Sequence, residues 1–305
     1  MLCNTKSWLF AALVAITMTA FDAKADYKEL WSLGTIDPDY VAAKKCGPGA
    51  FVVISWNVAD FGGSERPERI DAITEILRHS ELAFVLEVSG SHQGPKAAAV
   101  LQDALSRKGS NWRMSVSDAT SPEPAGKNTS ERIVALWKGH SVSVGAANSG
   151  LVSNLSETVA REPFRIEAIS PKLGKVEFFA FHARPENSGA LEESILVAKE
   201  ASSLSRLTVT DVKPDPGIGT VVLGDFNLSK TQLDRLFVPH GFRAGVTGAT
   251  SLRKGGDGLS RKRDNAYFRN ASVCEAGRIR TDKVFGTKSV TVSDHVPIYV
   301  AFQSE

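Results

Sequence analysis

The chain has 305 residues, with 36 Lys and Arg against 34 Asp and Glu, so its formal net charge is only +2. This balance argues against a protein that binds nucleic acid through overall basic charge, so any attraction to phosphate must be local. The length suits one large domain that can bury a sizeable core.

Residues 1–25 have the pattern of a secretory signal peptide. Lys6 supplies the positive start, an apolar run follows it, and Ala23-Lys24-Ala25 fits the small-x-small cleavage site. The apolar run is short for a transmembrane span, which needs roughly 20 residues. An uncleaved N-terminal anchor is the alternative. We expect a secreted or periplasmic protein without stable membrane association, with residues 26–49 as an extension and 50–305 as the domain.

Two cysteines, Cys46 and Cys274, remain after the signal peptide. An even number of cysteines in an oxidising compartment favours a disulfide. A bond that closes so long a loop stabilises the fold by about 2–5 kcal/mol in the loop-entropy description. Two buried free thiols are the alternative. We expect the disulfide.

The first part of the domain alternates apolar runs with amphipathic segments. Ala50–Val58 and Leu82–Val88 are nearly continuous apolar runs and predict buried strands. Residues 66–79 and 96–107 have apolar side chains at helical spacing and predict helices. Pro67 suits the first turn of the earlier helix.

Strand patterns dominate the middle of the domain. The predicted strands cover residues 112–116, 132–137, 164–169 and 176–181, with a loop at 120–130 and a turn at Lys172-Leu173-Gly174. A long helix is predicted over 191–207, and a linker rich in Pro and Gly follows it through Gly219.

The last third combines short strands with one basic loop. Strands are predicted at 221–223, 266–269, 281–285 and 296–302, and residues 245–265 are expected to form a mobile, Gly-rich surface loop. Buried strands that alternate with helices, with strand pairs between them, indicate a layered α/β fold. We expect two mixed sheets packed face to face with helices outside.

Polar residues stand at the ends of several predicted strands. They are Asn57, Glu87, Glu131 with Arg132, His182, Asp225 with Asn227, and Asp294 with His295. Ionisable groups attached to apolar strands are costly to bury unless a partner uses them. A hard divalent cation and a phosphate ester would use all of these groups.

Glu87 ends one apolar strand and predicts a metal site with Asn57. Mg²⁺ prefers oxygen ligands and usually takes one or two carboxylates, water and a substrate phosphate. An ordinary solvated carboxylate is the alternative for Glu87.

His182 and His295 are the two histidines with a candidate carboxylate partner. Histidine exchanges protons near neutral pH, and a carboxylate partner sets its tautomer. A purely structural role is the alternative for each. The other four histidines lack such a context and are expected at the surface or as caps: His79, His92, His140 and His240.

Asp225 and Asn227 lie two residues apart. On an extended segment both side chains point the same way, so a carboxylate and an amide would face one site. Gly-Asp-Phe-Asn is also typical of a turn, which is the alternative.

Taken in order, these motifs resemble the endonuclease/exonuclease/phosphatase superfamily, and its DNase I-like branch in particular, over Ala50–Phe302. The segments that carry the resemblance are Ser55-Trp56-Asn57-Val58, Phe84-Val85-Leu86-Glu87-Val88, Asn128-Thr129-Ser130-Glu131-Arg132, Arg161-Glu162-Pro163, Phe181-His182, Gly224-Asp225-Phe226-Asn227, Thr281-Asp282-Lys283-Val284 and Ser293-Asp294-His295. One departure is Leu86, which stands where the family usually has a glutamine.

The resemblance implies a four-layer α/β sandwich with a divalent-cation phosphodiesterase site. Glu87, assisted by Asn57, would hold Mg²⁺ or Mn²⁺, with Ca²⁺ as a further candidate, and Asp225 and Asp294 would complete the metal and water network.

The resemblance also implies the acid–base groups. The pairs Glu131–His182 and Asp282–His295 would provide a general acid and a general base, in an order that the sequence leaves open. Asn227 and Arg161 would stabilise charge on the phosphoryl oxygens.

The implied activity is endonucleolytic hydrolysis of DNA, with DNA favoured over RNA as the partner. Backbone phosphates would contact the cations Arg184, Arg253, Lys254, Arg261, Lys262 and Arg263, although a solvated charged turn is the alternative for the last five. A phosphatase or a lipid phosphodiesterase of the sphingomyelinase or inositol-phosphate type is the alternative on the same scaffold. An inactive binding protein is the alternative from another class, and a nuclease subunit of a toxin is a variant of the first reading.

Overall fold

The computed structural model describes residues 46–47, 49–120, 130–146, 149–155, 159–204 and 219–303. The predicted signal peptide, nearly all of the predicted extension, residues 128–129 of the resemblance and most of the predicted linker lie outside the described residues. No helix among the described residues is both long enough and apolar enough to cross a membrane.

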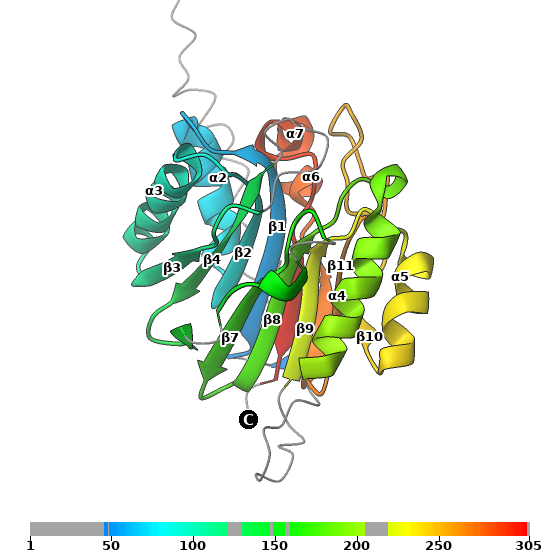
Figure 1. Cartoon of the computed structure of the whole chain (residues 1–305). Helices are drawn as coiled ribbons and strands as arrows, with labels where there is room; N and C mark the ends of the chain where they lie inside the picture. Colours follow the sequence, from blue (N-terminus) through cyan, green and yellow to red (C-terminus); the bar gives the residue numbers. More distant parts are fainter. Residues whose placement is uncertain are drawn as a thin grey trace, which may run out of the picture. The chain divides into compact units, whose positions relative to one another are not determined.

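The first of two mixed sheets has six strands. They are β1 (Phe51–Phe61), β2 (Leu82–Ser89), β3 (Trp112–Val116), β4 (Glu131–Lys138), β12 (Val273–Arg278) and β13 (Ile298–Phe302), in the order β12-β13-β1-β2-β4-β3. Only β1 and β2 pair in parallel, and the other neighbours are antiparallel. Strands β1 and β2 lie side by side (Figure 1). Because they run in parallel, Asn57 and Glu87 lie toward the same end of the two strands.

The second sheet has seven strands. They are β5 (Ser143–Val144), β6 (Gly150–Leu151), β7 (Phe164–Ser170), β8 (Gly174–His182), β9 (Gly219–Asp225), β10 (Arg243–Ala244) and β11 (Asp264–Arg269). The order is β10-β11-β9-β8-β7-β5, and β6 also pairs with β7. The parallel pair β8–β9 sets His182 opposite Asp225, where both strands end.

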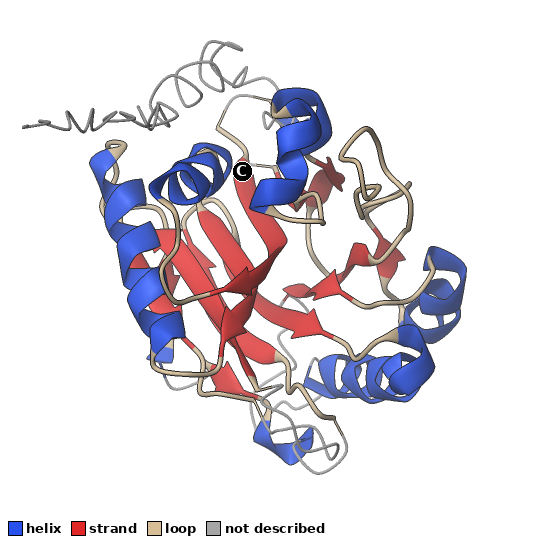
Figure 2. Cartoon of the chain, turned by 90° about the horizontal axis from the view of Figure 1, so that it is seen from above, coloured by secondary structure: helices blue, strands red, loops and turns tan. Residues whose placement is uncertain are grey.

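The inner faces of the two sheets form one apolar core. The Phe178 ring lies 5.9 Å from that of Phe84 and 6.2 Å from that of Phe302, so the second sheet contacts the first directly. A second core joins the outer face of β8 and β9 to α4 (Ala190–Leu204) and α5 (Lys230–Phe237). Helices α2 (Pro67–Leu77) and α3 (Gln93–Arg107) lie outside the first sheet (Figure 2). This is the four-layer α/β sandwich that the resemblance implies.

The predicted strand at residues 281–285 is wrong. These residues form the short helix α6 (Thr281–Val284), which a second short helix, α7 (Ser289–Val292), follows. The sheet edge is instead occupied by β12, a strand whose residues are all half-exposed. The sequence of β12, Val-Cys-Glu-Ala-Gly-Arg, has little apolar signal and so predicts no strand there. Residues 281–285 are too few for hydrophobic periodicity to separate a strand from a helix.

A disulfide joins Cys46 to Cys274, with 5.4 Å between the two Cα atoms. It confirms the expected bond and links the segment before β1 to the edge strand β12.

Candidate active site

Strands from both sheets bring the predicted polar residues to one edge of the sandwich. Asn57 ends the regular part of β1, Glu87 lies in an irregularity of β2, and His182 and Asp225 end β8 and β9. Glu87 has a φ of 57°, a conformation that a side-chain-bearing residue rarely adopts. Such strain often accompanies a functional site, and here it turns the carboxylate toward Asn57 and His182.

The first predicted histidine pair is present. His182 Nδ1 lies 2.7 Å from Glu131 Oε2, and the Arg161 guanidinium lies 3.2 Å from Glu131 Oε1 and 3.2 Å from His182 Nε2. Burial lowers the pKa of His182, but the charges of Glu131 and Asp225 outweigh this and raise it above its usual value. The two carboxylates therefore stabilise a proton on His182 more than water does.

The partner predicted for His295 is wrong, because His295 Nδ1 pairs with Asp264, 2.8 Å from its Oδ2. Asp282 instead forms a bidentate pair with Arg280. Burial lowers the pKa of His295, but Asp264 and Asp225 outweigh it and raise this pKa to about 10.

Asp264 carries a signal that the sequence-based prediction missed. With Asn265 it precedes the apolar run Ala266–Phe268, just as the Asp294-His295 motif precedes its own strand. The prediction of one mobile loop over residues 245–265 hides this signal, because it places Asp264 inside a loop rather than at the start of a strand.

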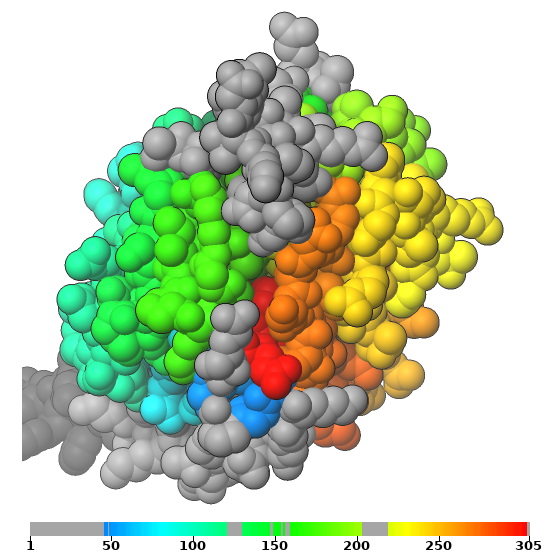
Figure 3. All heavy atoms as spheres, turned by 90° about the horizontal axis from the view of Figure 1, so that it is seen from below, coloured from blue at the N-terminus to red at the C-terminus, as the bar shows by residue number. Residues whose placement is uncertain are grey.

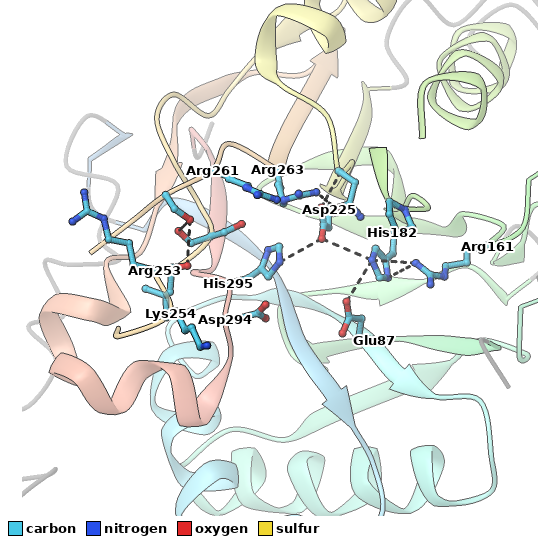
Figure 4. A pocket seen from close by; sticks show the side chains of 15 residues that line it. Glu87, Arg161, His182, Asp225, Arg253, Lys254, Arg261, Arg263, Asp294 and His295 are labelled. Carbon is cyan, nitrogen blue, oxygen red and sulfur yellow. Dashed lines mark hydrogen bonds and ion pairs between the residues drawn. The ribbon is translucent and has the colours of Figure 1, made fainter. Parts of the chain in front are cut away.

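Asp225 connects the two histidines. Its Oδ2 lies 3.6 Å from His295 Nε2, 3.8 Å from His182 Nε2 and 3.2 Å from Asn57 Nδ2. Its side chain is almost fully buried. Burial raises the pKa of Asp225, but His295 and His182 outweigh this and lower it, so the carboxylate stays ionised. Figure 4 shows Asp225 between the two imidazoles.

Two groups of side chains bring potential metal-ligating atoms within 4.8 Å of one another: Glu87, His182 and Asp225, and Asp225, Asp264 and His295. Glu87 and Asp225 offer the oxygen atoms that a hard cation prefers. The histidines suit this role less, because a hard cation prefers oxygen ligands to ring nitrogens. The first group therefore fits a divalent cation held mainly by carboxylate oxygens.

Asn57 and Asp294 take other positions than predicted for metal ligands. Asn57 turns its amide nitrogen to Glu87 Oε1, at 2.7 Å, and to Asp225, while its oxygen accepts a hydrogen bond from Ala59 N. It therefore orients the two carboxylates rather than offering its own oxygen to a metal ion. Asp294 is exposed and lines the hollow, outside both groups of ligating atoms.

Asn227 does not share an extended segment with Asp225. Its φ of 52° places it in a turn, where its backbone N–H donates to Asp225 Oδ1 at 2.9 Å. Its amide donates to the Ala183 carbonyl, and its oxygen accepts from Arg263. The turn alternative is thus the correct one, and Asn227 anchors Arg263 in the hollow.

A segment far along the chain closes the other side of the site. Ser251 bridges to His295, Leu252 bridges to Leu259, and Leu252 N donates to the Asp294 carbonyl at 2.7 Å. Residues 250–263 therefore form a hairpin that contacts the His295 motif. The expected loop over residues 245–265 is wrong at its end, because Asp264 and Asn265 belong to β11.

The hollow at this edge has a volume of about 690 Å³. Its walls carry five cationic side chains, namely Arg161, Arg253, Lys254, Arg261 and Arg263. Lys262 is exposed and does not line it, and Arg184 pairs with the buried Glu193 of α4 at 2.7 Å. The structure thus brings most of the predicted substrate-binding cations together, but not these two.

Buried hydrogen bonds hold the Ser293-Asp294-His295 motif in place. Ser293 Oγ donates to the Asn57 carbonyl at 2.6 Å and accepts from His295 N at 2.9 Å. Trp56 Nε1 donates to the His295 carbonyl at 2.9 Å. These bonds tie the His295 motif to the end of β1, so both sides of the site share one support.

Solved structures of other proteins share this fold. An endonuclease/exonuclease/phosphatase family protein from Bacteroides thetaiotaomicron superposes with a TM-score of 0.59 at 15% identity, covering 84% of this chain and 96% of that one. The chain has the endonuclease/exonuclease/phosphatase fold.

Other proteins of this fold match equally well. A mannosyl-6-phosphatase from the same species superposes with a TM-score of 0.59 at 15% identity, covering 82% of this chain and 98% of that chain. D. rerio TDP2, complexed with a single-strand DNA product, gives a TM-score of 0.59 at 15% identity, covering 84% and 100%. No family sequence model matches the chain, and no curated protein matches it significantly.

Proposed function

We propose that the chain is a divalent-metal-dependent phosphodiesterase, an endonuclease that hydrolyses the backbone of DNA outside the cytoplasm. The observation that carries this proposal is the pair of imidazoles, each bound to its own carboxylate, that face the same Asp225 oxygen from 3.6 and 3.8 Å. Two proton-transfer groups that flank one buried carboxylate suit a reaction in which one oxygen is deprotonated and another is protonated.

Each group has a distinct role in this reaction. His182 and His295 exchange protons with the attacking water and the leaving oxygen, while Glu131 and Asp264 orient their rings. Arg161 is placed to donate to a phosphoryl oxygen beside His182, which stabilises charge that develops there.

Glu87 and Asp225 would hold Mg²⁺ or Mn²⁺, with Ca²⁺ as a further candidate. A bound cation supplies Lewis-acid polarisation of the phosphoryl group. Asn57 keeps both carboxylates in place through its amide nitrogen.

Nucleic acid is favoured as the substrate by the basic hairpin. Arg253, Lys254 and Arg261 extend the cationic surface beyond the acid–base groups, further than one phosphate requires. The superposition on TDP2, a protein solved with DNA product, is consistent with this choice. A phosphatase is the second candidate, because the mannosyl-6-phosphatase superposes equally well.

Nicking of supercoiled plasmid in the presence of Mg²⁺ tests the proposal. We expect the wild-type protein to nick the plasmid, EDTA to abolish nicking, and His182→Ala and Asp225→Ala each to lower the rate by at least ~10²-fold. Robust nicking by both purified variants would sink the assignment. Phosphate release from a sugar phosphate, with the plasmid left intact, would favour the phosphatase.

A further inference from the structure

A second hollow adjoins the active site at the Glu87 and Arg161 side. Its volume is about 500 Å³, and it shares Glu87 and Arg161 with the hollow already described. Its other lining residues include Asp60, Ser89, Ser91, Gln93 and Glu131. In Figure 4, Glu87 and Arg161 lie beside His182, whereas Arg253 and Lys254 lie beyond His295. The two hollows therefore continue the cleft in different directions from the catalytic centre.

The two hollows differ in charge. Among the residues that they do not share, the first is lined by the four cations Arg253, Lys254, Arg261 and Arg263, whereas the described residues that line the second include no Lys or Arg. The unshared ionisable groups of the second hollow are acidic, namely Asp60 and Glu131. Among the described side chains of this hollow, Arg161 at the junction is thus the one cation that can contact a phosphate, so this side attracts backbone phosphates less than the first hollow does.

Uncharged polar groups line the second hollow instead. Ser89 Oγ and Ser91 Oγ lie 2.9 Å apart, and Gln93 N donates to Ser91 Oγ at 3.2 Å. Behind them the backbones approach closely, since a Cβ on Gly90 would lie 2.3 Å from the Ser130 carbonyl oxygen. Hydroxyls and an amide in a supported loop suit the hydroxyls of a sugar or the edge of a base.

We propose that the cleft is asymmetric: the 250–263 hairpin binds the phosphates on one side of the scissile bond, and the second hollow binds an uncharged nucleoside on the other side. This inference rests on the proposed function and names how the substrate lies in the site. Its consequence is that backbone charge matters for binding on one side of the cut only.

Duplex oligonucleotides in which the phosphates on one side of a chosen phosphodiester are neutral test this asymmetry, with cleavage at that bond identified by the length of the product. In one substrate the phosphates on the 5′ side of that bond are neutral methylphosphonates, and in the other those on the 3′ side are neutral. We expect one substrate to lose at least ~10-fold in kcat/KM and the other less than ~3-fold, because only one side meets the hairpin. Equal losses would overturn the asymmetric cleft. Failure to cut even the unmodified duplex would instead overturn the proposed function.

Substitutions assign the two sides. The triple variant Arg253→Gln, Lys254→Gln, Arg261→Gln should lower the salt dependence of log kcat/KM by about 1 for each phosphate that the hairpin no longer neutralises, and it should remove the difference between the two substrates. Gln93→Ala should keep the salt dependence but change the preferred base beside the cut. The matched control is Arg235→Gln, an exposed cation on α5. A triple variant with the wild-type salt dependence, or a Gln93→Ala variant that lowers it equally, contradicts the proposal.

Discussion

Individual side chains decide the protonation of this site. Asp225 is buried and ionised, and each imidazole that faces it is also bound to a second carboxylate. Each histidine therefore lies between two carboxylates, and these raise its pKa although burial alone would lower it. The acid–base capacity of the site depends on Glu131 and Asp264 as much as on the rings themselves.

Asp264 and Asp282 offer a matched pair of substitutions. Asp264→Asn removes the charge that orients His295, so we expect kcat for plasmid nicking to fall by about 10²–10⁴-fold. Asp282→Asn should leave kcat within about threefold, because its carboxylate pairs with Arg280 and not with a histidine. Single-turnover nicking measures both variants. Equal losses of kcat in the two variants would show that Asp282 contributes to the reaction as much as Asp264 does.

At the scale of elements, the junction of β8 and β9 sets the distance between His182 and Asp225. Gly224, with a φ of 139°, lies opposite Phe181, and a Cβ at this position would lie 2.0 Å from the Phe181 carbonyl oxygen. No side chain fits without a shift of the backbone.

Gly224→Ala should therefore destabilise the protein and disturb the site together. We expect the free energy of unfolding to fall by at least ~2 kcal/mol, with a parallel loss of nicking at temperatures where the variant is still folded. Urea denaturation and the nicking assay check the two effects. A variant with wild-type stability and activity would show that the two strands tolerate a side chain here.

A further histidine, His79, lies just after the end of α2, away from the candidate active site. His79, expected at the surface or as a cap, is half-buried beside Arg78, the C-terminal cap of α2. Its Nε2 atom is buried with no hydrogen-bond partner among the described residues. Burial, followed by the charge of Arg78, lowers the pKa of His79 to about 4. The folded protein thus keeps this ring neutral where the unfolded chain, with a pKa of about 6.5, takes up a proton.

The stability of the protein should therefore decrease as the pH falls from about 6.5 to about 4. After allowance for the partial exposure of the ring, we expect His79 to account for about 1–2 kcal/mol of this loss. His79→Gln should reduce the pH dependence in urea titrations, whereas His140→Gln, at an exposed position, should not. Identical pH profiles for the wild type and His79→Gln would contradict the argument.

For the molecule as a whole, the disulfide closes the fold at the end opposite the active site. Phe51 at the start of β1 pairs with Phe302, and Val273, beside Cys274, pairs with the same residue. Figure 3 shows from below that the start of β1, in blue, lies beside the end of the chain, in red. The bond therefore ties the two ends of the domain together.

Loss of this bond should reduce stability but not chemistry. We expect the double variant Cys46→Ser, Cys274→Ser to lose about 2–5 kcal/mol of unfolding free energy, because its unfolded chain is no longer closed into a loop. Nicking at 25 °C should stay within about twofold, since the catalytic groups lie at the far edge of the sheets. Thermal unfolding with and without reductant measures the effect. A wild-type midpoint in the double variant would show that the bond adds nothing.

The sequence by itself determined the strands of the core and most of the residues of the site. Continuous apolar runs predict buried strands wherever they occur, and Glu87, His182 and Asp225 stand at or near the ends of such runs. The Glu131–His182 pair was also accessible, because its two motifs match the family resemblance. These features depend on local pattern alone.

Only the tertiary structure decided which groups meet. Asp264 reaches His295 because β11 pairs with β9 in the register that sets Asp264 opposite Asp225. Pairing between strands that lie far apart in the sequence leaves no local pattern from which this register could be predicted. The same holds for Asn57, whose amide turns its nitrogen to two carboxylates from different sheets. It holds also for the 250–263 hairpin, which a bridge to His295 fixes in place. Periodicity reports what a segment buries, whereas the packing of two sheets decides what it faces.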